Sequence, residues 1–83
     1  MEPYTRAKIH FANTKEITEF VCELNSDGTA DKYVIENTES SHRVNARSLL
    51  GVIYMTTEYD DEMYLVNTTR GHIPAFVDKY RPY

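Results

Sequence analysis

Cysteine is almost absent from this sequence, which has one such residue, Cys22, among 83. A single thiol excludes a disulfide within the chain and cannot complete a cysteine-based zinc site. A lone cysteine on a helix is usually small core filling, so we expect Cys22 in the core. A chain without disulfides is typical of a reducing compartment, and we therefore expect a cytoplasmic protein.

Long apolar runs are also missing. No stretch approaches the roughly 20 apolar residues that a membrane-spanning helix needs. The first eight residues, MEPYTRAK, contain no apolar signal stretch. Both absences argue against a membrane partner and against secretion through a signal peptide.

Positive charge is scarce and scattered. Nine Lys and Arg stand against thirteen Asp and Glu, which gives a formal net charge of −4, and the basic residues form no dense tract. Nucleic-acid binders normally carry a basic stripe that neutralises phosphates, so we expect no nucleic-acid partner. With 41% hydrophobic and 27% charged residues the chain is typical of a globular protein. Its length predicts one domain, residues 1–83.

The alternation of apolar and polar residues predicts short strands separated by helices. Three segments carry an apolar stripe at helical spacing. The first starts at a capping box, with Asn13 as the N-cap and Glu16 three residues later. The second is short and starts behind Ser48, and the third covers Ile73 to Tyr80. We expect strands over residues 4–11, 32–36, 42–45 and 63–67, polar turn residues at 37–41 and an acidic loop at 57–62.

The expected element order is therefore β-α-β-β-α-β-α. Helices with one apolar stripe each must cover one face of a mostly antiparallel sheet, which predicts a two-layer α+β sandwich. Because every element is short, the apolar residues are needed together. We expect the centre of the core to contain Leu24, Ile35, Leu50, Leu65 and Phe76.

The segment VNARSLLGV, residues 44–52, resembles the second-helix signature of HPr, the histidine-containing phosphocarrier of the bacterial sugar phosphotransferase system. In that family the signature begins with Val and Asn, followed by either a small residue or Leu, then by either Lys or Arg, and then by Ser. Two bulky apolar residues, a Gly, and either Val or Ile complete it. The order of elements agrees over residues 7–80. The resemblance implies an open-faced β-sandwich, in which a four-stranded antiparallel sheet of order 1-4-2-3 is covered on one face by three helices.

The chain departs from the family at the phosphate-carrying histidine, which lies at the start of the first helix, usually within Gly-Ile-His-Ala-Arg-Pro. An ungapped alignment places His10 there but puts Ala12 where the family has Arg. A second alignment follows the cap at Asn13 and leaves His10 in the first strand, away from the N–H groups of a helix start. We favour the second and expect no catalytic residue and no enzymatic activity. The alternative is a divergent phosphocarrier that uses His10.

Ser48 corresponds to the serine that a dedicated kinase phosphorylates in Gram-positive relatives, where the product signals to a transcription factor. By itself the sequence favours Ser48 as the N-cap of the second helix. A phosphate there meets the helix N-terminus and neighbouring Arg47. Ser48 is thus either a phosphorylated switch or only a cap.

The apolar residues after this serine form a docking patch in the family. We expect Leu50 and Ile53 in the core and Leu49 exposed, so that Arg47 and Leu49 flank Ser48 as partner-binding residues. The partners that the resemblance implies are enzymes of the phosphotransferase system, a serine kinase or a transcription regulator.

No metal or cofactor site is expected. His10, His42 and His72 have no metal-ligand spacing, and the acidic run from Glu58 to Glu62 lacks the pattern of a calcium loop. The leading hypothesis is a regulatory, protein-binding module without phosphohistidine activity. A divergent phosphocarrier and a structural or dimerising domain stay as alternatives, and the sequence leaves the oligomeric state open.

Overall fold

The computed structural model describes residues 5–26, 32–39, 41–59, 62–69 and 72–82. The strands in these ranges are β1 (Thr5–Ile9), β2 (Tyr33–Asn37), β3 (Arg43–Asn45) and β4 (Met63–Asn67). The helices are α1 (Thr14–Asn25), α2 (Leu49–Tyr59) and the 3₁₀ helix η1 (Ala75–Tyr80). The predicted order β-α-β-β-α-β-α is confirmed.

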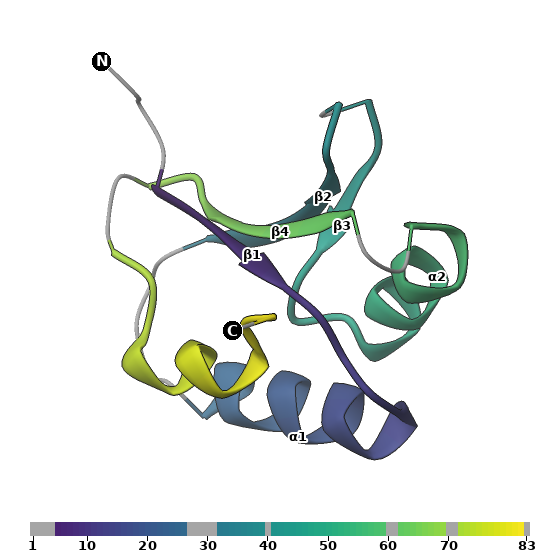
Figure 1. Cartoon of the computed structure of the whole chain (residues 1–83). Helices are drawn as coiled ribbons and strands as arrows, with labels where there is room; N and C mark the ends of the chain where they lie inside the picture. The colour runs from purple at the N-terminus through teal and green to yellow at the C-terminus, as the bar shows by residue number, and fades with distance from the viewer. Residues whose placement is uncertain (1–4, 27–31, 40, 60–61, 70–71, 83) are drawn as a thin grey trace.

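The four strands form one antiparallel sheet in the order β1-β4-β2-β3 (Figure 1). At its centre Leu65 of β4 stands opposite Ala7 of β1 on one side and Ile35 of β2 on the other. Figure 1 shows α1 and η1 against one face of this sheet, with α2 beside the end that carries β3. The expected α+β class, the antiparallel sheet and its strand order are therefore confirmed.

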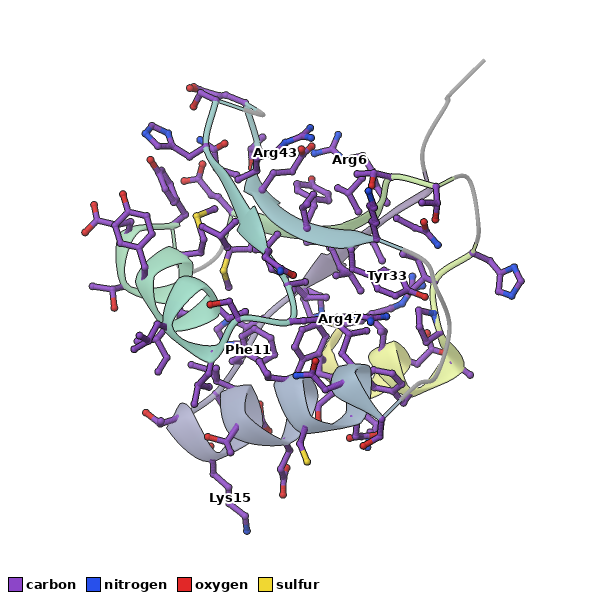
Figure 2. The ribbon with its side chains drawn as sticks, turned by 180° about the vertical axis from the view of Figure 1, so that it is seen from behind. Arg6, Phe11, Lys15, Tyr33, Arg43 and Arg47 are labelled. Carbon is purple, nitrogen blue, oxygen red and sulfur yellow. The ribbon has the colours of Figure 1, made fainter. Side chains whose placement is uncertain are left out.

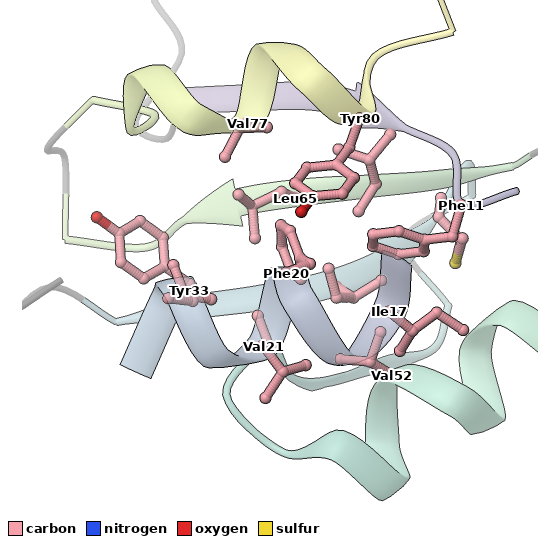
Figure 3. Close-up of a cluster of buried hydrophobic side chains, with 14 of the residues drawn as sticks. Phe11, Ile17, Phe20, Val21, Tyr33, Val52, Leu65, Val77 and Tyr80 are labelled. Atoms are coloured by element: carbon pink, nitrogen blue, oxygen red, sulfur yellow. The ribbon is translucent and has the colours of Figure 1, made fainter. Parts of the chain in front are cut away.

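The core lies between the sheet and the helices. Phe20 of α1 is fully buried (Figure 3). The centre of its ring lies 5.1 Å from the centre of the Phe11 ring and 5.4 Å from that of Tyr80 in η1. Leu24, Ile35 and Leu65 are also fully buried, as predicted. Phe76 packs against this cluster from a partly buried position.

Two expected core residues lie at the surface. Leu50 is 81% exposed, because α2 turns Val52 and Met55 inward and Leu50 precedes Val52 by about 200° of helical rotation. Cys22 is exposed for the same reason, since the inward face of α1 is formed by Ile17, Phe20, Val21 and Leu24.

Several element boundaries differ from the sequence expectation, most clearly at the ends of β1 and α2. β1 ends at Ile9, and residue 4 lies outside the described residues. α2 continues through residues 57–59, so the first half of the expected acidic loop is helical, whereas residues 60 and 61 lie outside the described residues. The hydroxyls of Thr56 and Thr57 donate to the carbonyls of Val52 and Ile53 one turn earlier, so both hydroxyls are hydrogen-bonded within the helix.

The last helix is a 3₁₀ helix. Its buried residues Val77 and Tyr80 are three apart, which places both on one side of a helix with three residues per turn. The Val77 N–H donates to the Pro74 carbonyl in the corresponding i to i+3 bond.

Candidate functional site

The start of α1 is closed by its own side chains. The Asn13 amide oxygen accepts a hydrogen bond from the Glu16 N–H at 3.0 Å, which confirms Asn13 as the N-cap. The Glu16 carboxylate in turn accepts from the Ala12 N–H at 2.8 Å. This reciprocal capping box puts a negative charge where an anion would otherwise meet the helix N-terminus.

His10 lies outside that helix start. It directly follows the last residue of β1 and precedes the cap by three residues. Its N–H donates to the Tyr80 carbonyl at 2.7 Å, so the backbone at His10 is joined to the end of η1. The structure therefore does not bring His10 to the first turn of α1.

Ser48 caps α2, as the sequence predicts. Its hydroxyl oxygen accepts from the Gly51 N–H at 3.2 Å, and its carbonyl accepts from the Val52 N–H at 3.0 Å. Gly51 packs closely here, since a Cβ at this position would lie 3.2 Å from the Cβ of Val44 in β3. Ser48 itself is half-buried.

Arg47 turns inward instead of standing beside Ser48 as an exposed charge. Its Nε and Nη2 atoms are buried, and its guanidinium carbon lies 5.4 Å from the centre of the Tyr33 ring (Figure 2). Its backbone is held by Asn45, whose amide oxygen accepts from the Arg47 N–H, and by Asn25, which donates to the Arg47 carbonyl. Arg47 is thus placed between the sheet and the end of α1.

The outer side of α2 is apolar and exposed. Leu49 is 39% exposed, Leu50 81% and Tyr54 48%, and we call these three side chains the α2 surface. The first charged residue of the helix is Glu58. A helix with apolar residues on both its inner and its outer side is typically in contact with protein on both sides. The exposure of Leu49 agrees with the prediction, whereas Leu50 and Tyr54 were not expected there.

Among the residues that the structure describes, the remaining histidines and carboxylates do not gather into a site. His42 and His72 are both exposed, and the Nδ1 atom of His42 lies 2.9 Å from the hydroxyl of Tyr59. Within the described ranges no three potential metal-ligating side chains come together. None of the helices in those ranges has the length and apolar character needed to cross a membrane.

Comparison of the chain with protein-family models, with curated proteins and with solved structures returned no match. The candidate site is therefore defined by its geometry, in which a serine cap opens a helix that exposes an apolar side. The signal that locates this side in the sequence is the lack of charge from Leu49 to Thr57.

Proposed function

We propose that this chain is a regulatory, protein-binding module related to HPr, which docks on partners through the α2 surface and carries no phosphate on histidine. The observation that carries the proposal is the 81% exposure of Leu50 on a helix that has no charged residue before Glu58. Exposed apolar side chains that gather on one surface gain free energy when a partner removes them from water.

The capping box supports the loss of phosphohistidine chemistry. A phosphoryl group at the start of α1 would meet the Glu16 carboxylate, which already accepts the Ala12 N–H. His10 precedes this start by several residues, and Ala12 stands where the resemblance expects an arginine. The chain thus offers little stabilisation for a phosphorylated histidine.

Ser48 supports a role in regulation. It is only half-buried and directly precedes Leu49 of the α2 surface. Phosphorylation would add up to about two negative charges there and keep them at the N-terminus of α2. Such a group would weaken the docking of an acidic partner and favour one that presents arginine. The partner classes implied by the resemblance are phosphotransferase-system enzymes, a serine kinase and a transcription regulator.

Calorimetric titration of the purified chain against one protein of each of these classes tests the proposal. We expect saturable binding to at least one of them and at least about a tenfold loss of affinity in Leu50→Asp, which places a charge in an apolar interface.

Cys22→Asp is the matched control, because it adds the same charge at an exposed position of α1. It should bind as the unmodified chain does. An absence of binding to all three classes, or an equal loss in both variants, would contradict docking through the α2 surface.

A further inference from the structure

The guanidinium of Arg47 carries a pair of donors that nothing in the described chain accepts. Both Nε and Nη2 are buried, and no hydrogen-bond acceptor from the described residues reaches them. The other arginines in these ranges all have carboxylate partners: Arg43 and Arg6 lie 2.8 Å and 3.6 Å from Glu36, and Arg81 lies 2.9 Å from Asp78.

These two nitrogens form one edge of the guanidinium. The N–H of Nε and one N–H of Nη2 point in parallel, at the spacing of two oxygens of one carboxylate or phosphate. A buried charged donor without an acceptor is costly, and an anion with two oxygens satisfies both N–H groups at once. The unpaired edge therefore has the geometry of an oxyanion receptor.

The surroundings hold this charge in place without neutralising it. The Tyr33 ring faces the guanidinium at 5.4 Å, which favours a cation over it. Figure 2 shows Arg47 close to Tyr33, between the sheet and α1. The backbone of Arg47 is fixed on both sides by hydrogen bonds to Asn45 and Asn25.

We propose that the Nε–Nη2 edge of Arg47 is a binding site for an oxyanion of the phosphate or carboxylate class, with Tyr33 behind the guanidinium. Arg47 as a whole is only half-buried, so part of this residue is in contact with solvent. The site goes beyond the proposed function, because it needs neither the α2 surface nor a modified Ser48.

Titration with inorganic phosphate, at constant ionic strength set with chloride, tests the site in the whole chain. The NMR signal of the Arg47 Nε–H reports directly on the edge. We expect it to shift in a saturable manner and to exchange more slowly with solvent. Arg47→Lys keeps the charge but loses the paired donors, and it should bind about tenfold more weakly. Arg43→Lys, at an arginine already paired with Glu36, should leave the phosphate affinity unchanged.

Thermal unfolding with and without phosphate gives an independent readout. In phosphate-free buffer Arg47→Met should unfold at the same temperature as the unmodified chain or a higher one, since it removes a buried charge without a partner. Phosphate should raise the unfolding temperature of the unmodified chain but not that of Arg47→Met. Ser48→Ala should retain the phosphate response, which separates phosphate in solution from a group attached to Ser48.

Three results would overturn the site. These are an equal phosphate response in Arg47→Met, a lower unfolding temperature of Arg47→Met in phosphate-free buffer, and loss of the response in Ser48→Ala. None of these results bears on docking through the α2 surface, which is tested with Leu50→Asp. A failure of one proposal is therefore distinguishable from a failure of the other.

Discussion

Leu50 and Val52 lie on opposite sides of α2 although only one residue separates them: Val52 is fully buried and Leu50 is 81% exposed. This arrangement divides the apolar residues of the helix into a set that packs against the core and a set that is exposed to solvent. Stability and binding should therefore respond to different residues.

Leu50→Asp and Leu49→Asp should leave the free energy of unfolding within about 0.5 kcal/mol of the unmodified chain. Both residues are exposed in the first turn of α2, where a carboxylate suits the helix dipole. Val52→Asp should prevent folding, because it buries an unpaired charge. Urea denaturation followed by circular dichroism measures all three. Unfolding of Leu49→Asp or Leu50→Asp would place that residue in the core instead.

Ser48→Ala should lower the free energy of unfolding by about 0.5–2 kcal/mol, because the Gly51 N–H loses the acceptor that caps α2. Ser48→Asp should be close to neutral, since a carboxylate accepts the same bond. Denaturation of the two variants side by side checks this. Equal and large losses in both would mean that the Ser48 hydroxyl has a different structural role.

Incubation with phosphoenolpyruvate and the general phosphotransferase enzyme should add no acid-labile phosphate to His10. The reason is the Glu16 carboxylate, which occupies the start of α1. Intact-mass measurement before and after mild acid treatment detects the modification, and an active HPr protein in a parallel reaction is the control. Acid-labile phosphate on His10 would favour the divergent phosphocarrier.

Stability should fall at alkaline pH through Tyr80. Burial, reinforced by the nearby Glu23 carboxylate that accepts its hydroxyl hydrogen bond, raises the pKa of Tyr80 from 10.0 to about 12. The unfolded chain loses this proton first, so the contribution is full below pH 10.0 and is lost as the pH rises toward about 12. Denaturation across this window should show a steeper loss of stability in the unmodified chain than in Tyr80→Phe. Parallel curves would contradict the raised pKa.

Much of the fold was predictable because periodicity and capping are local signals. The capping box at Asn13 and Glu16 fixes the start of α1, and the buried residues Leu24 and Leu65 follow from the apolar pattern. The length of α2 was not predictable from the acidic composition of residues 57–62, because polar residues at the end of a helix and in a loop look alike in the sequence, and residues 57–59 belong to the helix.

The candidate site was predictable only in part. Ser48 was expected as a cap and Leu49 as exposed, whereas Leu50 was assigned to the core. Nearly every residue from Leu49 to Met55 is apolar, so spacing alone does not determine which side faces the sheet. The inward turn of Arg47 brings its guanidinium to 5.4 Å from the centre of the Tyr33 ring, and this residue is distant in sequence and comes close only in the folded chain.

An amide NMR map of the chain bound to a phosphotransferase-system protein or to a serine kinase of that system tests docking through α2 most directly. The largest shifts should fall on Leu49, Leu50 and Tyr54, and they should disappear in Leu50→Asp while that variant keeps its folded spectrum. Shifts centred instead on the exposed residues Arg6, Lys8 and Arg43 of the sheet, with α2 unaffected, would contradict it.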